Sequence, residues 1–326
     1  MYDLMLKCNP IRPEKSRNQM SQNFADRLAQ SVKSKGNAVL VGIDPRPDQL
    51  PSHWIESFQG DVVRAVQEFG TEVVRTVAPL VPAVKFQMAF YEALGPTGMI
   101  ALEATAKCAR ENGLLVIMDG KRNDIGSTAA AYATAYVGSP EGGPENSSPA
   151  WTSDALTINP YLGGEGITPF LQGCRHTGAG LFLLVRTSNP SAGEFQDLIA
   201  DGKPVYRHVA DRMMNWAEPF RGECGYSSLG AVVGATSPAQ LAELRQVLRG
   251  IWILVPGYGA QGGTAADVAV AFDEQGLGAI VNNSRGITFA YQKSEFATRF
   301  GSNWQASVRE ATLTMINDLA KHTAKP

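Results

Sequence analysis

The sequence predicts a (β/α)₈ barrel, an α/β fold in which eight parallel strands alternate with helices and close into a cylinder. Eight short apolar runs rich in β-branched residues recur along the chain, which suits strands that are covered on both faces. Stretches of helical length separate them, and polar residues gather where the runs end. A chain of 326 residues fits one such barrel as a single domain, and an open doubly wound sheet is the alternative.

The expected elements alternate from the N-terminus onward. The segment SQNFADRLAQSV at 21–32 looks like the start of a capped helix, and helical periodicity returns at 61–78, 97–111, 238–248 and 264–274. The apolar runs that we expect to form the eight barrel strands are 38–43, 81–86, 114–118, 155–158, 181–185, 229–233, 251–255 and 279–281.

Two segments fall outside this pattern. Residues 1–19 carry two prolines and show no clear periodicity, so we expect a loose N-terminal extension ahead of a barrel that spans 20–326. The stretch GSPEGGPENSSP at 138–149 lies between an expected helix and an expected strand. It is therefore predicted to be a flexible insertion, at about 138–150, on the face of the barrel opposite the chemistry.

The composition argues against several classes of function. Charged residues make up 18% of the chain and the formal net charge is −2, which gives no electrostatic footprint for nucleic acid or an anionic membrane. No apolar run approaches the ~20 residues needed to cross a bilayer, and the N-terminus lacks a signal-peptide core, so a cytoplasmic protein is expected. The four cysteines and four histidines are scattered, so neither a disulfide framework nor a metal site is expected.

Charged residues stand at the end of the third expected strand, in MDGKRNDIGSTAAAYA at 118–133. Asp119 and Lys121 are two apart, so on a strand both side chains point to one face, here the barrel mouth. Lys85 on the second strand would complete a Lys–Asp–Lys array, in which each ion keeps its charge because it has an opposite neighbour. Salt bridges that merely close the barrel are the structural alternative, but three such residues at strand ends favour a functional site.

Two neighbouring residues have structural interpretations. Arg122 points the other way and is interpreted as a structural ion-pair partner. Asp124 precedes the expected helix in DIGSTAAAYATAY, where Asp is an ordinary N-cap, and on sequence logic alone the cap is favoured.

The segment PGYGAQGG at 256–263 joins the seventh expected strand to a helix and holds four glycines. Glycines let the backbone approach a ligand closely, and the N-terminus of a following helix offers free N–H groups to an anion. By itself the motif fits a tight loop equally well. Its position after strand seven matches a common phosphate site of barrels, and Arg285 after the eighth strand would add a bidentate donor. Together they predict a phosphorylated ligand.

The order of these motifs carries a resemblance to a known family. The run Asp119-x-Lys121-x-x-Asp124-Ile125, with Thr128 following, is similar to the D-x-K-x-x-D-I signature of orotidine 5′-phosphate decarboxylases, and the length resembles their longer bacterial subgroup. The resemblance covers nearly the whole chain after about residue 20. Its other features are Asp44 after strand one, Lys85 on strand two, TSNP at 187–190, PGYGAQGG at 256–263 and NNSRGI at 282–287.

That resemblance implies decarboxylation of orotidine 5′-monophosphate to uridine 5′-monophosphate without a cofactor, the last step of de novo pyrimidine nucleotide synthesis. Lys85, Asp119, Lys121 and Asp124 resemble the charged tetrad of the family. Lys121 would protonate C6 of the ring, and Asp119 would lie against the departing carboxylate. The residue types fit, because loss of CO₂ leaves negative charge on a ring carbon, which fixed cations and a ready proton donor stabilise.

The resemblance also implies how the substrate is held. Asp44 and Lys85 would bind ribose hydroxyls, and Ser188 would bind the pyrimidine edge. Segment 188–204 and the loop after strand seven are candidate lids over the ring. The substrate-binding residues at the phosphate end would be Gln261 and Arg285, with Pro256 and Gly262 beside them.

A homodimer with shared active sites is a further implication of the resemblance. Asp124, Ile125 and Thr128 would enter each site from the partner subunit, which reverses the N-cap interpretation of Asp124.

Two other functions stay open from the sequence alone. One is a sugar-phosphate aldolase or decarboxylase of the same barrel suprafamily, such as hexulose-phosphate synthase, which shares D-x-K-x-x-D but needs Mg²⁺. Those relatives have an acidic metal-binding residue on strand two, where this chain has Lys85. The other is a non-catalytic nucleotide-binding protein on a decayed barrel, although all four members of the charged cluster are present here.

Overall fold

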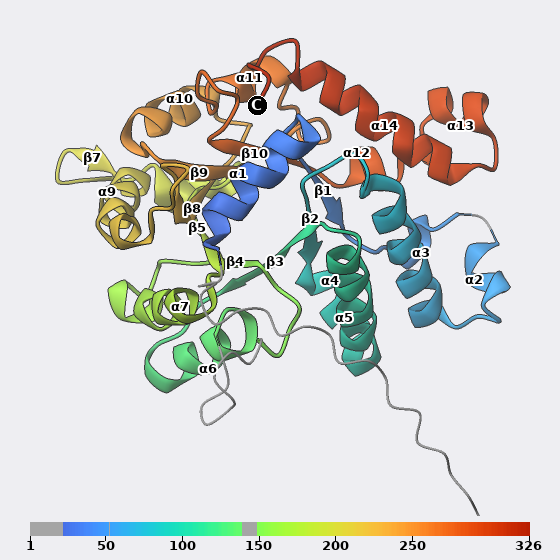
Figure 1. The fold of residues 1–326 in the computed structure, drawn as a ribbon, viewed down its shortest axis with the longest axis horizontal. Helices are drawn as coiled ribbons and strands as arrows, with labels where there is room; N and C mark the ends of the chain where they lie inside the picture. Colours follow the sequence, from blue (N-terminus) through green and yellow to red (C-terminus); the bar gives the residue numbers. More distant parts are fainter. Residues whose placement is uncertain (1–21, 52, 139–148) are drawn as a thin grey trace, which may run out of the picture.

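The computed structural model of the protein describes residues 22–51, 53–138 and 149–326. Eight parallel strands pair into a closed barrel in the order β1-β10-β9-β8-β5-β4-β3-β2 (Figure 1). The prediction of a (β/α)₈ barrel is therefore confirmed, and the open sheet is excluded. The barrel strands are β1 (Val39–Ile43), β2 (Ala83–Gln87), β3 (Leu115–Arg122), β4 (Ala155–Ile158), β5 (Gly180–Arg186), β8 (Ser227–Val233), β9 (Ile251–Val255) and β10 (Ala279–Asn283).

All eight predicted strands are present, and β3 departs most from its predicted length. It continues to Arg122, four residues beyond the expected end at Met118. The predicted extension at 1–19 and residues 139–148 of the predicted insertion lie outside the described residues.

Helices carry the chain around the outside of the barrel, as Figure 1 shows. Within the described ranges, none of them is long and apolar enough to span a bilayer. A small two-stranded sheet, β6 (Ile199–Ala200) with β7 (Lys203–Pro204), follows β5. The helices are α1 (Phe24–Lys35), α2 (Trp54–Ser57), α3 (Val62–Val77), α4 (Met88–Glu92), α5 (Gly95–Glu111), α6 (Gly126–Tyr136), α7 (Gly164–Thr177), α8 (Gly193–Gln196), α9 (Val205–Ala217), α10 (Pro238–Val247), α11 (Ala265–Ala269), α12 (Arg285–Thr288), α13 (Ser294–Phe300) and α14 (Trp304–Leu319).

Local chemistry explains where these helices start and stop. The Asp61 carboxylate accepts from the Arg64 N–H at 3.0 Å and so begins α3 where the sequence predicts it. The predicted helix at 264–274 is shorter, because α11 ends at Ala269. There the Asp273 carboxylate accepts from the Gln275 and Leu277 N–H groups, both at 2.8 Å, and this side-chain turn replaces further helix.

Helix α1 closes the N-terminal end of the barrel. It crosses the strands in Figure 1, and its apolar face, which includes Phe24 and Leu28, is completely buried. That face packs with inward-pointing side chains of the strands, so the interior of the barrel is filled beneath α1. The strand residues in this cluster are Leu40, Ala83, Ile117, Ala155, Phe182, Val232, Trp252, Leu254 and Ile280.

The inward face changes from apolar to polar toward the other end of the strands. Because strand side chains alternate with a period of two, the residue two places after each apolar member also points inward. Lys85 follows Ala83 on β2 in this way, and Asp119 follows Ile117 on β3. Thr157 follows Ala155 on β4, and Asn282 follows Ile280 on β10. On these four strands the open end of the barrel is therefore lined by polar side chains, whereas Leu184, Val232 and Leu254 keep it apolar on β5, β8 and β9.

Candidate active site

A cavity of about 620 Å³ lies at the carboxyl ends of the barrel strands. Its size suits a small molecule, and its position is where barrels of this kind carry out chemistry. Residues from β2, β3, β4, β5, β8, β9 and β10 and from the segments that follow β1, β2, β5, β9 and β10 line it. The predicted site residues that line it are Asp44, Lys85, Asp119, Lys121, Ser188, Pro256, Gln261 and Arg285.

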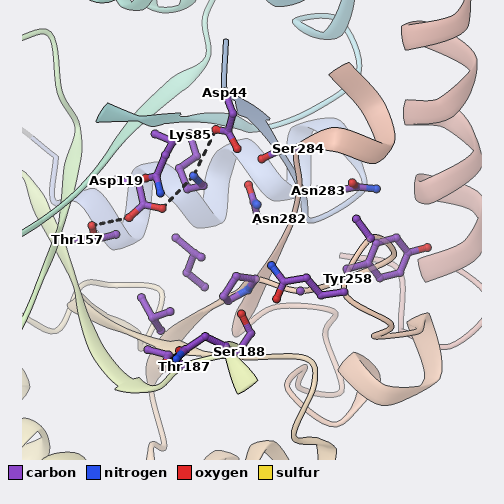
Figure 2. A pocket seen from close by; sticks show the side chains of 18 of the residues that line it. Asp44, Lys85, Asp119, Thr157, Thr187, Ser188, Tyr258, Asn282, Asn283 and Ser284 are labelled. Carbon is purple, nitrogen blue, oxygen red and sulfur yellow. Dashed lines mark hydrogen bonds and ion pairs between the residues drawn. The ribbon is translucent and has the colours of Figure 1, made fainter. Parts of the chain in front are cut away.

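Asp119 is the centre of a buried charged array at one end of this cavity (Figure 2). Its Oδ2 lies 2.9 Å from the Lys85 Nζ, and its Oδ1 lies 2.6 Å from the Lys121 Nζ. Asp44 extends the array, since its Oδ1 is 3.8 Å from the Lys85 Nζ. Only 5% of the Lys85 side chain is exposed, against 43% for Lys121. The predicted Lys–Asp–Lys array is therefore formed within one chain, with the Lys121 ammonium nearest to solvent.

The charges of the array stabilise one another against the cost of burial. Burial alone would raise the pKa of Asp119, but Lys85 and Lys121 hold it well below its usual range. Burial alone would lower the pKa of Lys85, but Asp119 and Asp44 together raise it above its ordinary value. Asp119 and Lys85 are therefore both ionised at neutral pH, before any ligand arrives.

The backbone of β3 reaches this arrangement through an irregularity rather than through plain alternation. Met118 pairs with Leu156 and Arg122 with Ile158, so the register against β4 shifts between these pairs. Lys121 has φ of +47°, a left-handed conformation that is uncommon for a residue other than glycine. The prediction that Lys121 and Asp119 share a face is confirmed, but a bulge produces it.

Arg122 has the structural role that the sequence predicts. Its guanidinium pairs with Glu92, donates to the Tyr136 hydroxyl at 3.3 Å, and lies over the Tyr132 and Tyr136 rings. It therefore fixes α6 and α4 against β3 and takes no part in lining the cavity.

Asp124, Ile125 and Thr128 lie outside the cavity of this chain. The N-cap interpretation of Asp124 is wrong, because α6 begins at Gly126 and Ile125 occupies the cap position. The Asp124 carboxylate instead accepts from the adjacent Ile125 N–H at 2.8 Å, which is too early in the chain to satisfy the first helical N–H groups. Ile125 is 48% exposed.

The other end of the cavity is built from the glycine-rich loop after β9. Gly257, Gly259 and Gly262 all have positive φ, and the Gly259 N–H donates to the Gly263 carbonyl at 2.8 Å. The motif therefore is a tight turn, and it also brings Gln261 to the cavity wall. Gly262 itself does not line the cavity.

Gln261 and Arg285 face solvent at this end. Both are exposed, and within the described part of the chain neither side chain makes a hydrogen bond or ion pair. The loop that carries Gln261 is held from behind, where the Tyr258 hydroxyl donates to the Asp318 carboxylate of α14 at 2.6 Å. Burial and this hydrogen bond raise the pKa of Tyr258. Gln261 on this supported loop and Arg285 at the start of α12 suit a ligand that brings its own negative charge.

Several cavity residues were missed by sequence reasoning, among them Thr157, Arg46 and Tyr258. Thr157 could have been found from the alternation on β4, since it lies two places after the inward-facing Ala155. Arg46 lies 4.9 Å over the Phe90 ring after β1, and Tyr258 lies in the glycine-rich loop. No local pattern marks these two as site residues. Across the described ranges, no group of three or more His, Cys, Asp or Glu side chains is placed to hold a metal ion.

Comparisons with known proteins agree with this geometry. Residues 40–300 match the model of the orotidine 5′-phosphate decarboxylase / HUMPS family. A curated orotidine 5′-phosphate decarboxylase of Rhodopirellula baltica is 48% identical over 301 residues, which cover 91% of this chain and 98% of that protein. The enzyme of the same name from Caldicellulosiruptor bescii is 39% identical over 278 residues, which cover 83% of this chain and 90% of that protein.

The fold of this chain is also similar to that of a solved structure. The OMP decarboxylase of Leishmania donovani superposes with a TM-score of 0.70 at 26% identity, covering 92% of this chain and 98% of that one. The match to the family model spans residues 40–300 of this chain. The identity to the curated relatives also extends over most of the barrel. The chain therefore belongs to the orotidine 5′-phosphate decarboxylase / HUMPS family.

Proposed function

We propose that this protein decarboxylates orotidine 5′-monophosphate to uridine 5′-monophosphate and CO₂, without a cofactor, in pyrimidine nucleotide synthesis. The observation that carries the proposal is the array in which Asp119 pairs with the buried Lys85 and the more exposed Lys121 at one end of the cavity, which we call the inner end. Fixed cations beside a proton donor suit a reaction that develops negative charge on carbon. Family membership and the names of the relatives support the same substrate.

In this mechanism the bond between C6 and the carboxylate breaks, and its electron pair stays on C6 as CO₂ departs. The Lys121 ammonium, which is the more exposed cation of the array, gives a proton to C6 and recovers one from solvent. Asp119 lies beside the departing carboxylate and orients Lys121 through their 2.6 Å contact. Lys85 balances the charge of Asp119 throughout.

The remaining cavity residues hold the nucleotide. Asp44 and Lys85, on the first two strands, bind ribose hydroxyls, and Ser188 after β5 binds the pyrimidine edge. Gln261 and Arg285, which make no side-chain hydrogen bond or ion pair with the residues that the structure describes, bind the phosphate. Pro256 shapes the wall between these two ends. Binding at the phosphate then holds the reacting carbon against the array.

Two copies of the chain share each site in a homodimer. Asp124, Ile125 and Thr128 lie outside the cavity of their own chain, and Ile125 is 48% exposed. Exposed apolar surface continues after β4, where Tyr161 is 83% and Leu162 43% exposed. Packing this surface against a second copy brings Asp124 to the fourth position of the charged tetrad.

The test is the ultraviolet absorbance of orotidine 5′-monophosphate incubated with the purified protein and excess EDTA, with product identity checked by chromatography. We expect stoichiometric conversion to uridine 5′-monophosphate. No conversion by the folded protein, with or without Mg²⁺, would overturn the proposal. Conversion that EDTA abolishes would contradict its cofactor-free form.

A further inference from the structure

Thr157 of β4 contacts both Asp119 and Lys121, the two residues that the proposed mechanism uses most directly, and Figure 2 shows it beside Asp119. It is 1% exposed, and its hydroxyl lines the cavity. The hydroxyl donates to the Asp119 Oδ1 at 2.9 Å and accepts from the backbone N–H of Lys121, also at 2.9 Å. One oxygen atom therefore contacts both the carboxylate and the backbone of the proton donor.

Hydrogen-bond counting makes the direction of these contacts definite. A threonine hydroxyl has one proton, and the Lys121 N–H can only donate, so the proton of Thr157 is left for Asp119. Oδ1 of Asp119 then accepts hydrogen bonds from the Thr157 hydroxyl and the Lys121 ammonium, while Oδ2 pairs with the Lys85 ammonium. With both oxygens occupied, the carboxylate plane is fixed.

The same hydroxyl supports the irregular backbone of β3. Between the pairs Met118–Leu156 and Arg122–Ile158, three residues of β3 face Thr157 alone. Lys121 has no register partner on β4 within this bulge, and its N–H donates to the Thr157 hydroxyl. Because Lys121 holds a left-handed φ of +47°, this hydrogen bond helps to keep its backbone in an uncommon conformation.

We propose that Thr157 is a positioning residue for decarboxylation, because its hydroxyl fixes Asp119 and the Lys121 backbone together. The inference rests on the proposed function. It assigns to Thr157 an effect on the chemical step rather than on nucleotide binding, since the phosphate and ribose contacts lie on other elements. A threonine that only packed the barrel would affect stability and leave the turnover rate unchanged.

The experiment compares Thr157→Val, which keeps the shape and removes the hydroxyl, with Thr157→Ser, which keeps the hydroxyl. We expect Thr157→Val to lower kcat by about 10- to 100-fold with KM changed by less than about 3-fold, as a small displacement of reacting groups does. Thr157→Ser should stay within about 3-fold of the wild-type kcat. Thr105→Val is the matched control, because Thr105 is equally buried but bonds only the Ala101 carbonyl within α5.

Several results would overturn the inference. A wild-type kcat in Thr157→Val would do so, and so would an equal loss in Thr157→Val and Thr157→Ser. If valine at this position prevents folding, Thr157→Ala against Thr157→Ser gives the same comparison, since alanine and serine differ by one oxygen. A wild-type protein that does not turn over orotidine 5′-monophosphate would overturn the proposed function, and the inference with it. Normal wild-type turnover with a fully active Thr157→Val would overturn the inference alone.

Discussion

The cavity has an inner end, which holds the charged array around Asp119, and an outer end, which holds Gln261 and Arg285. The two ends are built in opposite ways. At the inner end, Asp119 receives Lys85, Lys121 and Thr157 within 3 Å, and all of these contacts exist within one chain without a ligand. At the outer end, Gln261 and Arg285 are exposed and make no hydrogen bond or ion pair with the described residues. The fold alone therefore positions the charged groups of the inner end, whereas Gln261 and Arg285 at the outer end are left available to bind an anion.

This difference suggests a division of work along one substrate. Charges fixed beforehand stabilise charge that develops in a reaction, because they need not reorganise as it proceeds. Exposed polar groups that make no hydrogen bond or ion pair with the described residues, such as Gln261 and Arg285, gain most when a ligand supplies the missing charge, so they contribute binding. Changes at the inner end should therefore lower kcat, and changes at the outer end should mainly lower kcat/KM through capture of the substrate.

The largest expected effect follows removal of the proton donor. Lys121→Ala should lower kcat by about 10⁴-fold, since general acid catalysis contributes up to that factor. Steady-state kinetics on the purified protein measure this loss, with Lys107→Ala on the exposed face of α5 as the control. A kcat within 10-fold of wild type would remove Lys121 from the proposed role.

The proposed sharing of each site between two subunits is tested with mixed dimers. Lys121→Ala and Asp124→Asn homodimers should each be nearly inactive. After subunit exchange, random pairing makes half of the dimers mixed, and each mixed dimer has one intact site, so about a quarter of wild-type activity should return. Exchange shown by mass spectrometry without any recovery of activity would mean that the sites are not shared.

Loss of a phosphate contact should have a smaller effect. Arg285→Ala should lower kcat/KM by about 10- to 100-fold, because a hydrogen bond to a charged group contributes about 1.5–3 kcal/mol. The exposed Arg309 of α14 gives a matched control, Arg309→Ala, which should leave kcat/KM unchanged. An unaltered kcat/KM in Arg285→Ala would exclude this residue from the phosphate site.

Support of the loop from behind should matter less again. Tyr258→Phe removes the hydroxyl that donates to Asp318 at 2.6 Å but keeps the ring. Since one such bond contributes about 1 kcal/mol, KM should rise about 5-fold while kcat stays the same. A fall in kcat with constant KM would show that this loop acts on the chemical step, against the division proposed here.

Lowering the pH should reduce the contribution of Asp119 to the stability of the fold. Its pKa is lower in the folded protein than in the unfolded chain, so the carboxylate stabilises the fold above pH about 4. That stabilisation is lost as the pH falls from there toward the lowered pKa. Urea unfolding should therefore show wild type more stable than Asp119→Asn at pH 6, with the gap smaller at pH 3. A gap that does not change with pH would contradict the paired state of Asp119.

The sequence predicts the barrel and its charged array because both depend on local alternation. Apolar runs mark the strands, and a period of two carries Lys85 and Asp119 to the inward face. Prediction from the sequence fails where a contact depends on irregular backbone or on elements that are distant in the chain. The bulge that turns Lys121 toward Asp119 has no sequence signal beyond the motif itself, and the pairing of Tyr258 with Asp318 joins residues 60 apart in the chain.

The division between the two ends is tested most directly by comparing orotidine 5′-monophosphate with orotidine, which lacks the phosphate. The measurement is kcat/KM for both substrates with wild type and Arg285→Ala. If the outer end acts through the phosphate alone, Arg285→Ala should lower kcat/KM for the nucleotide and leave the value for orotidine unchanged. An equal loss for both substrates would show that Arg285 acts on the reacting end, and the account would be wrong.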